Sequence, residues 1–133
     1  MKRTILAVDG SKAIRFLLQN VFERKYKVVT ASDAASAMYW LSRNELPDAI
    51  IADPQLPDTE NWELLEHLKS SGLYSDIPLI VLSSLNKAVI AAKCDELGVA
   101  QHFSQPFNPV DLVNCVDKMF TGINKSTTKL KAV

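Results

Sequence analysis

Short apolar runs rich in β-branched residues alternate along the chain with longer segments whose apolar positions recur at helical spacing. Five such pairs can be counted. This alternation is typical of βαβ units around a parallel sheet, so we expect an α/β fold with five strands and five helices. The runs that predict strands are Thr4 to Val8, Tyr26 to Thr30, Ala49 to Ala52, Leu79 to Leu82 and Val99 to Ser104.

The segments between these runs carry the apolar stripe of helices that pack one face against a core. Ser32 is expected to cap the second helix, the fourth is expected over residues 87–97 up to Gly98, and the last begins at Pro109. The predicted inward residues are Ile14, Leu17, Leu18 and Val21; Ala34, Ala37, Met38 and Leu41; Trp62, Leu65 and Leu68; and Leu112, Val113, Val116, Met119 and Phe120.

The strand runs differ in a way that predicts their places in the sheet. Ala49 to Ala52 is apolar without alternation, as expected of a strand covered by helices on both faces. Lys27 within the second run predicts an edge strand. Residues 1–120 form one predicted domain, and residues 121–133 are polar and unpatterned, so we expect them to form a mobile basic tail.

Charge excludes one class of partner. The chain has 15 basic and 15 acidic residues, but three lysines lie in the tail at Lys125, Lys129 and Lys131, which leaves 12 basic against 15 acidic residues in the predicted domain. No predicted helix carries a basic stripe. A mildly acidic domain without such a stripe is not expected to bind nucleic acid directly.

Cysteine content and hydropathy indicate the compartment. Cys94 and Cys115 form no Cys-x-x-Cys pair and have no histidine at metal-ligand spacing, so neither a disulfide framework nor a zinc site is expected. Packing is the expected role of Cys94. The first apolar run is too short for a signal peptide, and no stretch approaches the length of a membrane span. We therefore expect a soluble, cytoplasmic protein.

Polar side chains follow four of the predicted strands at the point where each strand ends. Asp9 follows the first strand, Asp53 the third, Ser83 the fourth and Gln105 the fifth. In an open parallel sheet, functional groups gather beyond the carboxyl ends of the strands, near the point where strand order reverses. The spacing therefore predicts that these four side chains share one site.

Four segments lie in order within residues 3–120: Ile5 to Asp9, Ile50 to Asp53 with Leu56-Pro57, Ile77 to Ser83, and Gln105 to Phe107. Together they resemble the signature segments of response-regulator receiver domains of two-component signalling. The resemblance implies a flavodoxin-like, doubly wound sheet in the order 2-1-3-4-5, a cis Gln105-Pro106 bond, and Asp53 as acceptor of a phosphoryl group from a kinase histidine. It also implies Mg²⁺ as cofactor, and a sensor histidine kinase or phosphotransfer protein as partner in a two-component or phosphorelay pathway.

The resemblance is incomplete at the metal site. Receiver domains have an acidic pair after the first strand; Asp9 matches its first member, and Gly10 stands in place of the second, the direct metal ligand. The implied ligands are then Asp9, Asp53 and the backbone carbonyl of Gln55. Because Mg²⁺ requires oxygen ligands in a near-octahedral array, the loss of one carboxylate predicts weak binding.

The resemblance is also incomplete at the residues that contact the phosphoryl group. Ser83 matches the hydroxyl residue of the family, whereas Gln105 replaces its lysine. Gln105 can donate only a neutral hydrogen bond, which is roughly half as strong as a charge-assisted one. His102 stands where the family often has a switch aromatic. In ordinary receiver domains three carboxylates face one lysine, whereas here Asp9 and Asp53 face no cation. We therefore expect phosphorylation to be slow.

Other interpretations remain open for the same residues. Asp53 could simply cap loop amides, and Asp9 could simply form a turn. The domain could act as a phosphorylation-independent pseudo-receiver, or as a binding module without a signalling role. A metal-dependent phosphotransferase of the haloacid-dehalogenase type needs a second aspartate two residues after the nucleophile, where this chain has Gln55, so no enzyme is expected. Val89 and its alanine neighbours are more apolar than one buried helix face requires, so some of them must face outward. We therefore expect residues 87–120 to support weak self-association.

Overall fold

The structure, a computed structural model, describes the backbone of residues 2–132 and the side chains of residues 2–122. Strands and helices alternate along this part of the chain, as the sequence predicts. Their bounds are β1 Thr4–Val8, α1 Lys12–Phe22, β2 Lys27–Ala31, α2 Ala34–Arg43, β3 Ala49–Ala52, α3 Glu63–Ser70, β4 Leu79–Ser83, α4 Lys87–Leu97, β5 Gln101–Ser104 and α5 Pro109–Ala132.

The five strands form one parallel sheet in the order β2-β1-β3-β4-β5. This is the predicted order, and β2 is at an edge as the charge of Lys27 indicates. Strand β3 lies at the centre, and all four of its residues are buried. From β1 the chain adds β2 on one side, and then adds β3, β4 and β5 on the other side. The direction thus reverses between β1 and β3, so the carboxyl ends of these two strands lie at the switch point of the fold.

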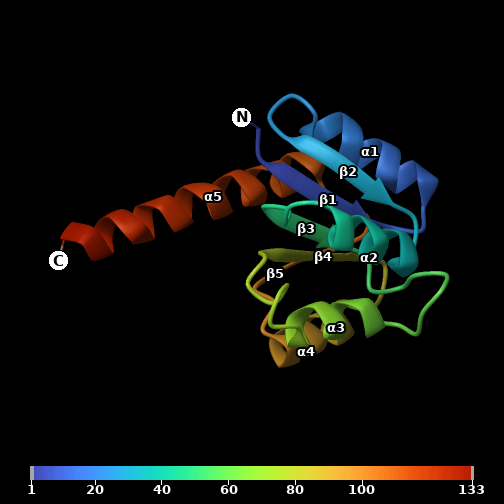
Figure 1. Cartoon of the computed structure of the whole chain (residues 1–133). Coiled ribbons are helices and arrows are strands. Elements are labelled where there is room, and N and C mark those ends of the chain that lie inside the picture. The colour runs from blue at the N-terminus through green and yellow to red at the C-terminus, as the bar shows by residue number, and fades with distance from the viewer. Residues whose placement is uncertain (1, 133) are drawn as a thin grey trace.

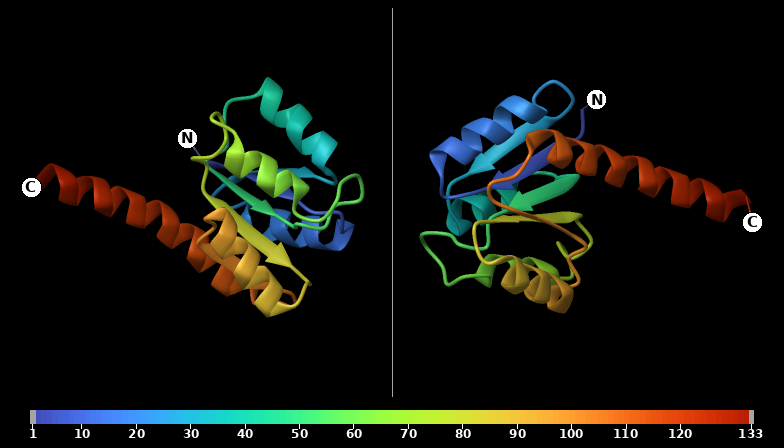
Figure 2. Two further views of the ribbon diagram at one scale, coloured as in Figure 1. Left: turned by 90° about the horizontal axis from the view of Figure 1, so that it is seen from below. Right: turned by 180° about the vertical axis from the view of Figure 1, so that it is seen from behind.

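Helices cover both faces of the sheet (Figures 1 and 2). One core cluster joins the sheet to α1 and α5 through residues such as Leu18 and Leu112. The other joins the opposite face to α2, α3 and α4 through residues such as Leu41, Leu65 and Ile90. Because every strand side chain of β3 is covered by one of these layers, the central strand needs no polar alternation.

Several element boundaries differ from the sequence prediction for identifiable reasons. Asp33, not Ser32, caps α2, because its side chain accepts the N–H of Ser36 at 2.8 Å. Strand β5 begins at Gln101 instead of Val99, since Val99 is used in the connection after α4, where its N–H bonds to the carbonyl of Cys94. Cys94 is buried, which agrees with its expected packing role.

The start of α3 has an unusual backbone conformation. Trp62 is buried as predicted, but it precedes the helix as its N-cap residue, with φ of 72° and no side-chain cap. A left-handed conformation is disfavoured for a bulky residue. The Trp62 N–H donates to the carbonyl of Pro54 at 2.8 Å, so the residue is held there by the loop that follows β3 as well as by burial of its ring.

Helix α5 extends further than the apolar pattern predicts. The pattern ends near Phe120, whereas the backbone remains helical to Ala132 and this part projects away from the sheet (Figure 1). Once a helix has formed, each added residue contributes a hydrogen bond without a new nucleation step, and no proline stops it here. Mobility of residues 121–133 stays a prediction, and Val133 lies outside the described residues. No helix of the described part is long and apolar enough to cross a membrane.

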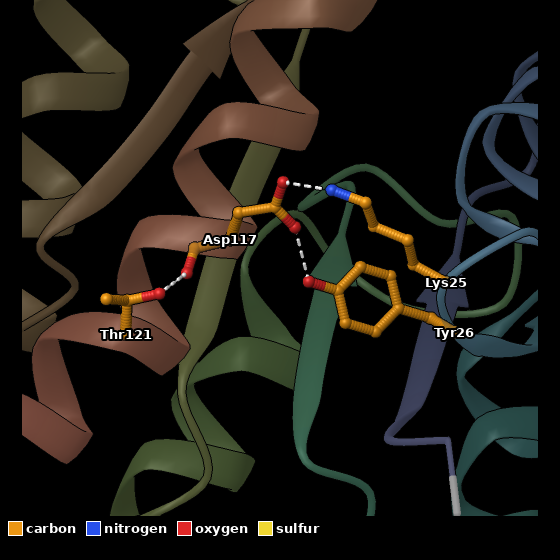
Figure 3. Close-up of polar contacts among 4 residues, drawn as sticks. All are labelled: Lys25, Tyr26, Asp117 and Thr121. Carbon is orange, nitrogen blue, oxygen red and sulfur yellow. Dashed lines mark hydrogen bonds and ion pairs between the residues drawn. The ribbon is translucent and has the colours of Figure 1, made fainter.

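A polar cluster holds α5 against the turn between α1 and β2 (Figure 3). The Tyr26 hydroxyl donates to Asp117 Oδ1 at 2.5 Å, and Lys25 Nζ lies 2.9 Å from Asp117 Oδ2. Tyr26 also packs against the ring of Phe120. Desolvation raises the pKa of Tyr26, and its hydrogen bond to Asp117 raises it further. This contact between α5 and the α1–β2 turn was not predictable from either segment alone.

Replacing Tyr26 by phenylalanine is expected to lower the free energy of unfolding by about 1.5 kcal/mol, because a buried hydrogen bond to a charged acceptor is lost. The control is Lys25→Met, which removes an ion pair whose lysine side chain is 64% exposed. Such a pair contributes about 0–1 kcal/mol. Urea unfolding of both variants tests the difference; equal losses would show that the hydroxyl has no special part in holding α5.

Candidate functional site

The four predicted site residues lie at the carboxyl edge of the sheet, directly after or at the end of their strands. Asp9 and Asp53 follow β1 and β3, which are neighbours in register at Val8 and Ala52. Ser83 ends β4, and its carbonyl accepts the N–H of Gln105 at 2.8 Å. The Gln105-Pro106 bond is cis, as predicted. The connections β1–α1, β3–α3 and β5–α5 and the last residue of β4 therefore supply one residue each.

Asp9 is 2% exposed and is held in a tight turn. Its Oδ1 accepts the N–H of Ser11 at 2.8 Å, whereas its Oδ2 is buried without a hydrogen-bond partner among the described residues. Burial raises the pKa of Asp9, although the Ser11 N–H and the charge of Arg15 lower it in part. A buried carboxylate oxygen without a partner is costly unless a cation or a proton joins it.

Arg15 corrects the prediction that the carboxylates face no cation. It lies in the first turn of α1, and its Nη1 donates to the backbone carbonyl of Asp9 at 2.8 Å. Its charge acts on the Asp9 carboxylate. Arg15 is six residues after Asp9, a spacing that carries no signal for this contact. The direction of its side chain could not be predicted from spacing.

Asp53 is half-buried beside Asp9. Burial and the neighbouring Asp9 carboxylate raise the pKa of Asp53 to about 6, although the N–H of Gln55, which donates to Oδ1 at 2.8 Å, acts in the opposite direction. Two neighbouring carboxylates disfavour double ionisation of the pair. The group is still mainly ionised at pH 7 to 8, so Asp53 can act as a nucleophile.

Ser83 and Gln105 provide neutral hydrogen-bonding groups at the same edge. Ser83 is fully buried, and its Oγ accepts the N–H of Leu85 at 3.1 Å, which leaves the hydroxyl hydrogen free to donate. Gln105 is partly buried. Beside Asp53, the Gln55 side chain accepts a long hydrogen bond of 3.5 Å from Ser84 Oγ. These groups can orient an anion but do not neutralise it.

His102, the proposed switch residue, lies on the strand next to β4, and its role stays a prediction. It is exposed on the edge strand β5, in register with Val81 instead of Ser83. It lines a cavity of about 470 Å³ between α4 and the β5–α5 connection. On the same side of the domain, Val89 of α4 is 50% exposed, and its alanine neighbours are exposed too, which agrees with the predicted apolar patch.

The oxygen donors at this edge fit a divalent cation that prefers hard ligands. Asp9 Oδ2 is buried and lacks a partner among the described residues, and the Asp53 carboxylate lies near it. No cluster of three or more acidic, histidine or cysteine side chains suited to a metal occurs in the described part of the chain. The donor set therefore fits Mg²⁺ but lacks a third carboxylate.

Position 10 could accommodate the missing carboxylate. A Cβ added to Gly10 would lie 3.4 Å from Pro57 Cδ and 3.9 Å from the carbonyl oxygen of Ser32, which are ordinary contact distances. The backbone at position 10 therefore admits a Cβ without a clash.

Comparison with known proteins agrees with this geometry. The family model described as "Response regulator receiver domain" matches residues 5–117. The DNA-binding transcriptional regulator NtrC of Rhizobium meliloti is 28% identical over 96% of this chain and 26% of its own length. The two-component response regulator ORR6 of rice, Oryza sativa subsp. japonica, is 31% identical over 81% of this chain and 65% of its own length. The chain thus spans about a quarter of the first of these relatives.

Solved structures share the fold. A CheY-like response regulator receiver domain protein from Methanospirillum hungatei covers 95% of this chain and 99% of its own, with a TM-score of 0.82 and 24% identity. The chemotaxis response regulator CheY4 of Vibrio cholerae covers 89% of this chain and 98% of its own, with a TM-score of 0.77 and 24% identity. At these identities the likeness shows the doubly wound five-stranded fold.

Proposed function

This chain belongs to the response-regulator receiver family, and from that premise we propose that it is a cytoplasmic signalling module whose Asp53 accepts a phosphoryl group at a weakened site. Receiver domains interact with histidine kinases or phosphotransfer proteins, and one of these is the proposed donor. The observation that carries the proposal is the place of Asp53, half-buried at the switch point of the sheet beside Asp9. Incubation with a small phosphodonor, followed by intact mass measurement, tests it.

The proposed transfer uses the free oxygen of Asp53. Because Oδ1 accepts the Gln55 N–H, Oδ2 is the oxygen we assign to attack on phosphorus. The P–O bond to Asp53 forms as the P–N bond to the donor histidine breaks, and that histidine nitrogen keeps the electron pair. The Ser83 hydroxyl and the Gln105 amide then donate hydrogen bonds to phosphoryl oxygens.

We assign Mg²⁺ to Asp9, Asp53 and the backbone carbonyl of Gln55. When bound, the ion supplies positive charge that offsets the charge on the phosphoryl oxygens. Gly10 adds no third carboxylate to hold the ion, and Gln105 adds no positive charge beside the phosphoryl group. Both metal binding and charge compensation are therefore weak in this proposal. Arg15 donates to the Asp9 carbonyl, and its positive charge partly offsets the charge of the Asp9 carboxylate. The site can therefore persist when the metal is bound only weakly.

A phosphorylation-independent pseudo-receiver is the second candidate function. It is favoured by Arg15, because a resident cation beside Asp9 stabilises the site without metal or phosphate. If the parent chain is never modified at Asp53 but still binds its partner, this second function replaces the first.

An enzymatic role is not part of the proposal. A phosphotransferase of the haloacid-dehalogenase type would need an acid two residues after Asp53, and Gln55 is exposed there and carries no proton that it could transfer at neutral pH. An assay with an aryl phosphate and Mg²⁺ separates the two classes: turnover that depends on Asp53 would overturn the signalling assignment.

The proposed self-association uses the apolar side chains exposed on α4. Replacing Val89 with aspartate is expected to weaken dimerisation about 10-fold, equivalent to about 1.4 kcal/mol, because a charge replaces a half-exposed apolar side chain. Phe16→Asp is the matched control, since Phe16 on α1 is 68% exposed on another face. Sedimentation velocity over a concentration series measures both; equal effects would exclude α4 as the contact.

A further inference from the structure

Asp58, in the loop between β3 and α3, is a carboxylate that the proposed chemistry does not use. Asp58 Oδ1 accepts the N–H of Ala34 at 2.9 Å, and Asp58 Oδ2 accepts the N–H of Ala35 at 2.9 Å. Both N–H groups belong to the first turn of α2, where backbone donors have no partner within their own helix. One side chain of the loop thus forms two bonds to an element more than twenty positions earlier in the chain.

Helix α2 does not need Asp58 as its cap. Asp33 already accepts the N–H of Ser36 at 2.8 Å, and one side-chain cap is the usual device at a helix start. A second carboxylate adds favourable charge at the positive end of the helix. It also joins two separate parts of the chain, which Asp33 does not do.

The loop is packed into the core through Leu56 and Trp62, but it has few other polar bonds to neighbouring elements. Pro54 and Pro57 lack an N–H group and cannot donate to a neighbouring element. The bond from Trp62 N–H to the Pro54 carbonyl closes the loop on itself. From Gln55, the contact with Ser84 is long, at 3.5 Å. The paired bonds of Asp58 are therefore the best-formed polar link from the middle of the loop to another helix.

The position of this loop matters to the site at two points. The Gln55 N–H bonds to Asp53 Oδ1, and the Gln55 carbonyl is the proposed third ligand for Mg²⁺. Pro57 lies against position 10, at 3.4 Å from where a Cβ would be. A displacement of the loop changes both distances. The bonds to α2 also lower the pKa of Asp58, so that the carboxylate stays ionised near neutral pH.

We propose that Asp58 is a positioning residue that ties the β3–α3 loop to the start of α2 and thereby places Gln55 for its bond to Asp53 and for metal binding. The metal-binding part rests on the proposed function. The tie between loop and helix does not, and it can be measured without metal or phosphate.

The experiment compares the parent with Asp58→Ala and with the matched control Asp33→Ala by ¹H–¹⁵N spectra of the full chain. Without metal, the amide signals of Gln55 and Trp62 are expected to shift in Asp58→Ala and to stay in place in Asp33→Ala, although both variants lose a cap of α2.

In a Mg²⁺ titration, Asp58→Ala is expected to bind about 10-fold more weakly than the parent, the lower end of what outer-shell partners of metal ligands contribute. Asp33→Ala should stay within about twofold, because its bond serves α2 alone. Asp58→Asn, which keeps one acceptor oxygen, should be intermediate in both readouts and replaces Asp58→Ala if that variant does not fold.

The outcomes separate the inference from the function on which it partly rests. Metal-free Gln55 and Trp62 signals that stay in place in Asp58→Ala, or that shift equally in Asp33→Ala, would overturn the tie. Equal losses of Mg²⁺ affinity in the two variants would also overturn it, because the effect would then pass through the stability of α2. A parent that shows no response to Mg²⁺ contradicts the proposed metal site, and the metal-free spectra still decide the tie.

Discussion

The double variant Gly10→Asp with Gln105→Lys is expected to bind Mg²⁺ at least about 10-fold more tightly than the parent chain, a change of about 1.4 kcal/mol. The physical reason is the third carboxylate, which gives the hard cation one more oxygen ligand. The Cβ of the new aspartate would meet only ordinary contacts. The lysine is expected to act on the phosphoryl group more than on the metal, because it restores a charge-assisted bond.

Calorimetric or spectroscopic titration of the double variant and of each single variant measures this effect. Gly10→Asp alone should account for most of the gain in Mg²⁺ affinity, and Gln105→Lys alone should lower affinity slightly by repulsion between cations. A double variant that binds no better than the parent would show that these two departures do not limit the site. The assignment of receiver chemistry to it would then be wrong.

Asp53→Asn is expected to stabilise the metal-free chain at pH 8. The pKa of Asp53 is raised from 3.8 to about 6 in the folded chain, chiefly by burial and then by Asp9. The stability associated with this shift is fully present below pH 3.8 and is lost as pH rises through about 6, because the folded chain then holds a charge that the unfolded chain solvates better. With about 1.36 kcal/mol for each pKa unit, reduced for partial solvation, the neutral amide should gain about 1 to 2 kcal/mol.

Urea unfolding of parent and Asp53→Asn at pH 8 and pH 4.5, in the presence of a chelator, measures the gain. The difference should be largest at pH 8 and clearly smaller at pH 4.5, where the carboxyl is protonated in the folded chain but already mainly ionised in the unfolded chain. Asp48→Asn serves as control, because Asp48 lies at the opposite end of β3, where its carboxylate accepts the N–H of Thr4. A destabilising effect of Asp53→Asn at pH 8 would contradict the electrostatic description of the site.

The fold was predictable because its strongest signals are local. Continuous apolar runs predicted β1 and β3 to the residue, and Gly98 and Pro109 marked the end of α4 and the start of α5. The parallel order followed from alternation of strands and helices together with the family resemblance. The end of α5 was predicted too early, because continuation of a helix depends on backbone hydrogen bonds more than on an apolar stripe.

The candidate site was predictable only in part. Strand ends placed Asp9 and Asp53 side by side, because the carboxyl ends of neighbouring parallel strands meet. Arg15 and Asp58 were missed, since both act through bonds to backbone groups whose positions depend on the tertiary structure. Ser32 was chosen over Asp33 as a cap because either residue type suits that place, and the structure alone distinguishes them.

The central claim is that Asp53 accepts a phosphoryl group and that Gly10 and Gln105 limit the reaction. The measurement that tests it most directly is the intact mass of parent, double variant and double variant with Asp53→Asn after incubation with acetyl phosphate and Mg²⁺. We expect little or no phosphoryl adduct on the parent, a clear adduct on the double variant and none when Asp53 is replaced. An adduct on the double variant that persists after Asp53→Asn, or no adduct on the double variant although it binds Mg²⁺, would contradict the claim.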